Sequence, residues 1–277
     1  MTTPAPHLTF IGAGNMTYSL VVGLLKNGHD PARICVADPF DRQLEKFRPL
    51  AITTYTDNSE AITGADVVVL AVKPQIARDV VTAFQTLKAE QLLLSIAAGI
   101  NIASLAKWSA QEQAIVRCMP NTPALLGAGM SALFANSNCN TAQVGTAEYI
   151  LQAAGDALWV NHEGELDAVT AVSGSGPAYF FLLMESMIDA GVELGLEPEI
   201  AARLTLQTAY GAALMAKESS DRPDALRQNV TSPGGTTAAA LDVMIKQSMP
   251  DTVASAIQAA NERAEQLAKE FGGDQEP

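Results

Sequence analysis

The sequence has few of the residues that build metal sites, disulfide frameworks or histidine-based catalytic triads. It contains three cysteines and three histidines, which lie far apart and include no CxxC pair. We therefore expect free, buried thiols in a reducing cytosol, with no metal site and no histidine-based triad. These residues are Cys35, Cys118, Cys139, His7, His29 and His162.

Positive charge is also scarce. The chain has 17 lysines and arginines against 30 aspartates and glutamates, which gives a formal net charge of −13. Nucleic acids and anionic membranes attract clustered Lys and Arg, so neither is expected as a partner. Residues 1–7 lack the basic start of a signal peptide, and apolar runs such as 67–72 fall short of the about 20 residues that span a bilayer. The sequence therefore predicts a cytoplasmic protein without a membrane span.

Strand-like and helix-like runs alternate through the first part of this 277-residue chain, which is 48% hydrophobic and long enough for two domains. Apolar runs without polar alternation are typical of strands covered on both faces. The alternation predicts an α/β fold, a doubly wound parallel sheet with its ligand crevice at the carboxyl ends of the strands. We assign this Rossmann-type dinucleotide-binding domain to residues 1–162. The expected strands are 8–11, 33–37, 65–72, 91–97 and 115–119, with a helix at 74–88.

A glycine-rich turn follows the first expected strand and precedes a helical run. Gly12 permits a tight turn, and Gly14 lets a pyrophosphate approach the backbone where the helix N-terminus faces its charge. Thr17 replaces the third glycine of the pattern. The order of strand, turn and helix at the start of the chain predicts a dinucleotide site.

A carboxylate at the end of the second strand is the usual partner of the adenosine ribose hydroxyls. Asp38 occupies this position and would favour NAD(H) by repelling a 2′-phosphate. Arg42, Lys46 and Arg48 are close enough in sequence to offer that phosphate a cation, so the preference stays open. Asp38 could equally do no more than begin a turn with Pro39.

The second half is expected to be all-helical, with no strand from residue 163 to 271. Its helical runs are apolar on more than one side, which indicates packing against another subunit. Small residues at 173–176 before Pro177 predict a tight junction between two helices. We assign residues 163–277 to this domain, with a disordered tail at 272–277. The expected helices are 166–172, 178–194, 200–217, 223–229, 236–248 and 253–271.

Residues 230–237 combine a proline and two glycines directly before an alanine-rich helix. Free N–H groups at such a helix start point outward with the positive end of the helix dipole, which can receive a carboxylate or phosphate. An ordinary capped helix explains the same pattern. The N–H groups concerned belong to Gly234, Gly235, Thr236 and Thr237.

Five blocks resemble the pyrroline-5-carboxylate reductases in order and spacing. The likeness covers nearly the whole chain, and the last three blocks in combination are highly specific. The blocks are residues 10–16 (FIGAGNM), 71–75 (AVKPQ), 117–123 (RCMPNTP), 173–179 (SGSGPAY) and 232–237 (SPGGTT).

The resemblance implies an enzyme that reduces 1-pyrroline-5-carboxylate to L-proline by hydride transfer from NADPH or NADH. It also implies a Rossmann domain followed by an all-helical domain that builds a homodimer, which often assembles into a decamer. Hydride transfer needs reacting atoms about 3–3.5 Å apart, so the helical domain is expected to close on the crevice of the sheet domain.

The same resemblance implies the site residues. Thr237 is the expected catalytic residue, with its hydroxyl at the ring nitrogen. Asp38 departs from NADPH-preferring members, which often hold an uncharged residue there, and Thr17 stands where alanine is usual. The matching substrate contacts are Val230, Ser232, Gly234, Gly235, Thr236 and Thr237. The matching cofactor contacts are Gly12, Ala13, Gly14, Asn15, Met16, Asp38, Asn58, Ala71, Val72, Lys73, Pro74, Ala97, Glu163 and Asn229.

Two other interpretations are open. A β-hydroxyacid dehydrogenase has a similar pair of domains, but Phe180 stands where its catalytic lysine is expected. An NAD(P)-sensing protein without activity would have a damaged substrate loop, whereas residues 232–237 are intact. The sequence does not decide the preference between NADH and NADPH, the number of subunits, feedback control by proline or activity on related cyclic imines.

Overall fold

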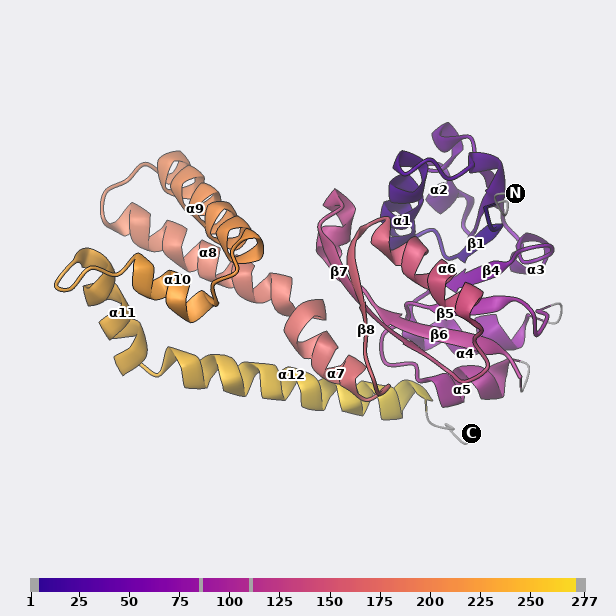
Figure 1. Cartoon of the computed structure of the whole chain (residues 1–277). Helices are drawn as coiled ribbons and strands as arrows, with labels where there is room; N and C mark the ends of the chain where they lie inside the picture. Colours follow the sequence, from indigo (N-terminus) through magenta and orange to yellow (C-terminus); the bar gives the residue numbers. More distant parts are fainter. Residues whose placement is uncertain (1–4, 85–86, 110–111, 273–277) are drawn as a thin grey trace. The chain divides into compact units, whose positions relative to one another are not determined.

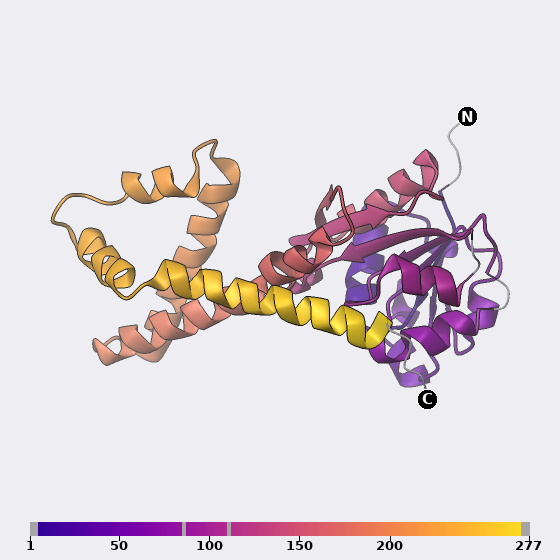
Figure 2. The same ribbon diagram turned by 90° about the horizontal axis from the view of Figure 1, so that it is seen from below.

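The computed structural model describes residues 5–84, 87–109 and 112–272 of the chain. The chain folds into two compact units. The sheet unit contains the residues up to Ser175 and those from Ala260 onward, and the helical unit is Gly176–Ala259. The division falls inside the last helix, α12 (Met249–Gly272), which is drawn in yellow in Figure 2. The expected functional boundary after residue 162 is a different division and stays a prediction.

An eight-stranded sheet forms the core of the sheet unit, in the order β3-β2-β1-β4-β5-β6-β7-β8. All neighbouring strands are parallel except β6 and β7. The central strands β1 and β4 are buried along their whole length, as expected for apolar runs covered on both faces. The strands are β1 (Leu8–Ile11), β2 (Ile34–Ala37), β3 (Thr53–Tyr55), β4 (Val67–Leu70), β5 (Leu92–Ser95), β6 (Ala114–Met119), β7 (Gly129–Ala135) and β8 (Gly155–Trp159).

The order of the strands reverses at β1. The chain moves outward from β1 to β2 and β3, then crosses to β4 on the other side of β1. The connections that leave β1 and β4 diverge at the carboxyl ends of these strands, and ligands of open α/β sheets bind at such a switch point. Because the glycine-rich turn follows β1, the topology places it at this point.

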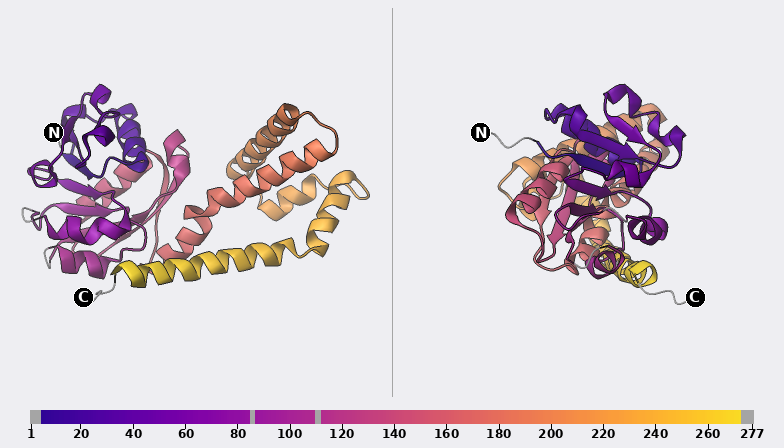
Figure 3. Two further views of the ribbon diagram at one scale, coloured as in Figure 1. Left: turned by 180° about the vertical axis from the view of Figure 1, so that it is seen from behind. Right: turned by 90° about the vertical axis from the view of Figure 1, so that its right-hand side faces the viewer.

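Helices cover both faces of the sheet (Figure 3). Alternate residues of a strand point to opposite faces. Phe10 therefore joins the core under α1 and α6, whereas Ile11 joins the core under α4 and α5. The helices are α1 (Asn15–Lys26), α2 (Asp41–Leu44), α3 (Asn58–Ala61), α4 (Pro74–Thr82), α5 (Ile102–Trp108), α6 (Thr141–Gln152), α7 (Glu165–Val169), α8 (Gly176–Glu193), α9 (Pro198–Glu218), α10 (Pro223–Asn229), α11 (Thr236–Lys246) and α12. Shorter 3-10 turns are η1 (Pro31–Arg33), η2 (Arg48–Leu50) and η3 (Thr122–Leu126), and η4 (Thr170–Gly174) is π-helical.

The expected fold class, a Rossmann-type sheet followed by a helical domain, is confirmed. The pattern misses β3, β7, β8, α2, α3, α5 and α6, and the helix expected at 74–88 ends at Thr82. Strand β7 is antiparallel to β6 because their connection is shorter than the about twelve residues that a parallel crossover needs. Gly272, expected in a disordered tail, is the last residue of α12, and residues 273–277 lie outside the described residues.

The helical unit is built around α8 and α9, which lie side by side (Figure 1). A Cβ on Gly191 of α8 would lie 3.3 Å from that of Ala201 in α9, so the two helices are closely packed. Many large apolar side chains of this unit are exposed, which is typical of an interaction surface. They include Phe180, Phe181, Leu182, Leu204, Leu206, Tyr210 and Met215. Among the described helices, none combines the length and apolar character needed to cross a bilayer.

Helix α1 lies so close to the segment before β8 that Gly23 has no room for a side chain. A Cβ there would lie 1.9 Å from the carbonyl oxygen of Ala153. We predict that Gly23→Ala lowers the free energy of unfolding by about 1–3 kcal/mol, because the two backbones must move apart. In Gly145→Ala, the matched control in α6, the new Cβ meets nothing within 4 Å. This control should raise the free energy of unfolding by about 0.5–1 kcal/mol. Urea unfolding of both variants checks the prediction, and an unchanged midpoint for Gly23→Ala would contradict it.

Candidate functional site

The turn after β1 is closed by backbone contacts to both neighbouring strands. The N–H of Gly12 donates to the carbonyl oxygen of Ala37, and the N–H of Ala71 donates to that of Ile11, both at 2.8 Å. Gly12 has a φ of +101°, a value that L side chains rarely adopt. A Cβ on Gly12 would lie 2.5 Å from the carbonyl oxygen of Ala71 and 3.1 Å from Cγ1 of Val72. Only glycine therefore fits between the ends of β2 and β4.

Helix α1 begins directly after this turn. Its N-cap, Gly14, has no side chain to cap the first turn, and a Cβ placed there would meet nothing within 4 Å. The backbone at Asn15 and Met16 is thus open to an anion at the positive end of the helix dipole. Thr17 is fully buried, and its hydroxyl donates to the carbonyl oxygen of Gly12 at 2.6 Å. Thr17, which replaces the third glycine, therefore stabilises the turn through a buried hydrogen bond.

Asp38 lies beside this turn, at the end of β2. Its Oδ2 accepts a hydrogen bond from the N–H of Ala13 at 2.9 Å, and its Oδ1 accepts one from the N–H of Phe40 at 3.0 Å. The backbone N–H of Asp38 donates to the carbonyl oxygen of Tyr55 at 3.1 Å. The contact with Phe40 belongs to the local turn, and the contact with Ala13 ties the half-buried carboxylate to the glycine-rich turn.

Further predicted residues follow β3, β4 and β5 at the same edge. Oδ1 of Asn58 is buried and has no hydrogen-bond partner among the described residues. A buried unpaired acceptor costs about 1–3 kcal/mol, which a ligand that donates a hydrogen bond would relieve. Lys73 is the exposed N-cap of α4 and Pro74 its first residue. Ala97 is buried, and its N–H donates to Oγ of Ser95 at 3.3 Å.

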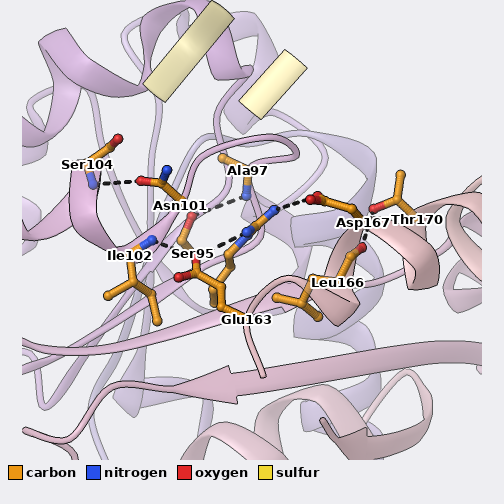
Figure 4. Close-up of polar contacts among 10 residues, drawn as sticks. Ser95, Ala97, Asn101, Ile102, Ser104, Glu163, Leu166, Asp167 and Thr170 are labelled. Atoms are coloured by element: carbon orange, nitrogen blue, oxygen red, sulfur yellow. Dashed lines mark hydrogen bonds and ion pairs between the residues drawn. The ribbon is translucent and has the colours of Figure 1, made fainter. Parts of the chain in front are cut away.

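Glu163 is held by two neighbours within the sheet unit. Its Oε1 accepts hydrogen bonds from the N–H of Ile102 at 2.7 Å and from Nη1 of Arg117 at 3.1 Å. Nη2 of Arg117 lies 3.6 Å from Oδ1 of Asp167, and the Arg117 side chain is only 7% exposed. Figure 4 shows the side chains of Glu163 and Asp167 beside the start of α5. We call Arg117, Glu163 and Asp167 the charged cluster, which joins α5, β6 and α7.

Burial raises the pKa of the Asp167 carboxyl, the positive charge of Arg117 opposes this, and the negative charge of Glu265 adds to it. Asp167 and Glu265 also line an open hollow with Asn101 and Lys269. The sequence contains a signal for this cluster. An arginine inside the apolar run that forms β6 needs a carboxylate partner, because a buried unpaired charge is strongly destabilising.

The π-helical turn η4 leads into the helical unit and is tied to the sheet. Pro177 has no N–H for the carbonyl oxygen of Ser173, and this oxygen accepts a hydrogen bond from Nδ2 of Asn121 at 3.2 Å. Oδ1 of Asn121 accepts one from the N–H of Met130 at 2.8 Å. The expected tight junction is therefore a π-helical turn, a feature that is frequent at functional sites.

The predicted substrate loop of the helical unit contains a tight turn. Pro233 and Gly234 are its central residues, Gly234 has a φ of +71°, and the N–H of Gly235 donates to the carbonyl oxygen of Ser232 at 3.0 Å. This is the arrangement of a type II turn. The sequence-based prediction of a free N–H at Gly235 is thus wrong, because that group closes the turn.

Helix α11 begins directly after the turn. Gly235 is its N-cap and makes no side-chain hydrogen bond. Thr236 and Thr237 form the first turn, where backbone N–H groups have no partner within the helix. Thr237 is half-buried, whereas Thr236 and Val230 are exposed. The loop therefore retains donors for a small anion even without the N–H of Gly235. Asn229 precedes it as the last residue of α10.

The structure divides the predicted residues into separate sets. One set is joined directly at the carboxyl ends of β1, β2 and β4, and consists of Gly12, Ala13, Asp38, Ala71 and Val72. Asn229 and the loop at 230–237 belong to the helical unit. Within residues 5–84, 87–109 and 112–272, no three His, Cys, Asp or Glu side chains gather in a way that could hold a metal ion.

Two protein families match separate regions of the chain. Residues 163–267 match the family described as pyrroline-5-carboxylate reductase dimerisation, and residues 7–99 match the family described as NADP oxidoreductase, coenzyme F420-dependent. The pyrroline-5-carboxylate reductase of Pseudomonas aeruginosa is 51% identical, over 96% of this chain and 98% of that protein. That of Arabidopsis thaliana is 36% identical, over 94% of this chain and 95% of that protein.

Solved structures are similar over the same extent. A pyrroline-5-carboxylate reductase from Coxiella burnetii has a TM-score of 0.90 and 42% identity, covering 96% of this chain and 99% of that one. Pyrroline carboxylate reductase from Plasmodium falciparum, with NADP bound, has a TM-score of 0.85 and 33% identity, again covering 96% and 99%.

Removal of the cation from the charged cluster should be costly. We predict that Arg117→Met lowers the free energy of unfolding by roughly 3–5 kcal/mol, because two poorly solvated carboxylates lose their partner. Arg48→Met is the matched control. It removes an arginine from a pair with Asp41 whose side chains are 54% and 61% exposed, and should cost less than about 1 kcal/mol. Chemical unfolding of both variants is the measurement, and equal losses would refute the role of the cluster.

Proposed function

The chain belongs to the pyrroline-5-carboxylate reductase family, and from this membership we propose which of its residues carry out the reaction. It is an oxidoreductase that reduces 1-pyrroline-5-carboxylate to L-proline by hydride transfer from NADPH or NADH, the last step of proline biosynthesis. The observation that carries this conclusion is the 51% identity to a reductase of this name over 96% of the chain.

The proposal assigns the dinucleotide to the carboxyl edge of the sheet. Three observations support the fit: the Gly12 turn admits no Cβ, the backbone at Gly14 is open, and Oδ1 of Asn58 is buried without a partner. The turn and the start of α1 would hold the pyrophosphate, and Asp38 the adenosine ribose. The further contacts in this proposal are Ala13, Asn15, Met16, Asn58, Ala71, Val72, Lys73, Pro74, Ala97, Glu163 and Asn229.

The loop before α11 is proposed as the substrate site. The N–H groups of Gly234, Thr236 and Thr237 would hold the substrate carboxylate, with the remaining contacts from Val230, Ser232 and Gly235. The uncapped start of α11 supports this role, because it offers donors and the positive end of a helix dipole to an anion. In the proposal the Thr237 hydroxyl contacts the ring nitrogen and thereby orients the C=N bond.

Reduction of the protonated imine adds a hydride to carbon, and the electron pair of the C=N bond moves to nitrogen. NADH or NADPH supplies this hydride when bound. The role of the protein is to orient the ring and to bind its charged groups. In the proposal the start of α11 binds the carboxylate, and Thr237 binds the protonated ring nitrogen.

The protein forms homo-oligomers, as the match to a dimerisation family indicates. We propose a homodimer built by residues 163–277, in which the partner subunit covers the exposed apolar side chains of α8 and α9. Such dimers would assemble further into a decamer. Sedimentation equilibrium would measure the size of the assembly, and a monomer at micromolar concentration would contradict the proposal. A cytosolic location is also proposed, which the three unpaired cysteine thiols support.

An activity assay tests the function directly. We expect the purified protein to oxidise NADH or NADPH when 1-pyrroline-5-carboxylate is added, and to leave a panel of β-keto acids unreduced. Product analysis should identify L-proline. Turnover of a keto acid without turnover of the imine would instead favour a β-hydroxyacid dehydrogenase, and dinucleotide binding without any turnover would favour a sensing protein.

The proposed role of Thr237 can be tested with a near-isosteric change. Thr237→Val should lower kcat by about 100-fold, because a positioned hydrogen-bonding group at the reacting nitrogen is lost. Thr237→Ser should keep activity within about tenfold of the wild type, since it retains the hydroxyl. Thr82→Val is the matched control, because the hydroxyl of Thr82 bonds only carbonyl oxygens of its own helix. Full turnover by Thr237→Val would remove Thr237 from the mechanism.

A further inference from the structure

We propose that Asp38 makes this enzyme bind NADH in preference to NADPH. The inference rests on the proposed function, since it concerns the dinucleotide of the same reaction. It runs against the similarity of the N-terminal region, whose matched family is described as an NADP oxidoreductase. The preference depends on how the Asp38 carboxylate is held and on where the nearby cations lie.

Both oxygens of the carboxylate are fixed in place. Oδ2 accepts a hydrogen bond from the N–H of Ala13 at 2.9 Å, and Oδ1 accepts one from the N–H of Phe40 at 3.0 Å. The main chain of Asp38 is itself bonded to Tyr55 in β3. The charge therefore cannot swing away from an incoming phosphate without breaking a hydrogen bond to the glycine-rich turn. Because a carboxylate has about four acceptor positions, two are left for a ligand.

These two acceptors suit a ribose diol and not a phosphate. The 2′- and 3′-hydroxyls of NADH can each donate a hydrogen bond to them. In NADPH the 2′-hydroxyl is replaced by a phosphate, which has no proton to donate when fully ionised and carries a negative charge. Asp38 can therefore accept two hydrogen bonds from NADH, whereas its charge repels the 2′-phosphate of NADPH.

The cation on η2 is already engaged. Nη2 of Arg48 lies 2.6 Å from Oδ1 of Asp41, so this arginine already has a carboxylate partner, although the pair is exposed and weak. Arg42 lies exposed on α2 between these residues and is included in the test below.

Lys46 is the cation whose pKa is affected by the charge of Asp38. Its Nζ lies 5.8 Å from the centre of the Tyr18 ring and 5.4 Å from that of the Phe47 ring. Burial lowers the pKa of Lys46, and the negative charge of Asp38 opposes that shift. A 2′-phosphate would have to compete with Asp38 for this one ammonium group. The local charges therefore favour the dinucleotide that brings no further anion.

Equilibrium binding tests the proposal without any substrate. Titration of the full-length protein with NADH and with NADPH should give a Kd for NADH at least about tenfold lower. Displacement of NADH by AMP and by adenosine 2′,5′-bisphosphate isolates the adenosine half and should show the same order. Asp38→Asn, which keeps an acceptor oxygen but removes the charge, should bring the two Kd values within about threefold.

Matched variants separate Asp38 from a general change in charge. Asp30→Asn removes one charge from the opposite end of β2, where Asp30 caps η1, and should leave the Kd ratio unchanged. Arg42→Gln and Lys46→Gln should each change the Kd of NADPH by less than about threefold. A selective tenfold loss of NADPH binding in either variant would identify a phosphate receptor and overturn the proposal.

The proposal also falls if the wild type binds NADPH as tightly as NADH, or if Asp38→Asn keeps the wild-type ratio. These outcomes are distinct from failure of the proposed function. A protein that prefers NADH but never reduces the imine would refute the function alone, and an active reductase that prefers NADPH would refute only the role of Asp38.

Discussion

The close approach of three strand ends around Gly12 is the constraint on which the proposed nucleotide site depends. The N–H of Gly12 is bonded to the end of β2, and its α-carbon lies against the carbonyl of Ala71 after β4. This leaves no space for a Cβ and fixes where α1 begins. The same contacts bring the Asp38 carboxylate to the N–H of Ala13. The geometry of the turn, the charge beside it and the direction of α1 are therefore consequences of one packing arrangement.

The charged cluster performs a comparable task where the sheet gives way to helices. Arg117 supplies one buried positive charge to Glu163 and Asp167, and Glu163 also holds the first N–H of α5. Asn121 adds a neutral link, because its amide bonds the carbonyl that Pro177 leaves free. Hydrogen bonds and ion pairs thus fix α7 and η4 to the sheet. These contacts depend on direction, so they specify one geometry for the turn more strictly than apolar packing does.

The sequence is informative wherever one residue type alone satisfies a local requirement. Gly12 in the turn and the uninterrupted apolar runs of β1 and β4 both have a pattern that predicts their structure. Features that arise from tertiary packing leave a weaker trace. The hydrogen bonds from Ala13 to Asp38, from Ile102 to Glu163 and from Asn121 to Ser173 join residues far apart in the sequence, which no local pattern specifies.

The sheet unit is discontinuous in the chain, and this has a consequence for biosynthesis. Its last part, from Ala260, packs beside α5. There the carbonyl oxygen of Gly272 accepts a hydrogen bond from the hydroxyl of Ser104, and Leu267 lies against Gly99. A ribosome makes α5 long before it makes these residues. The nascent nucleotide domain therefore keeps this surface uncovered until residues 260–272 have been synthesised, and a polypeptide released before then would expose it to chaperones and proteases.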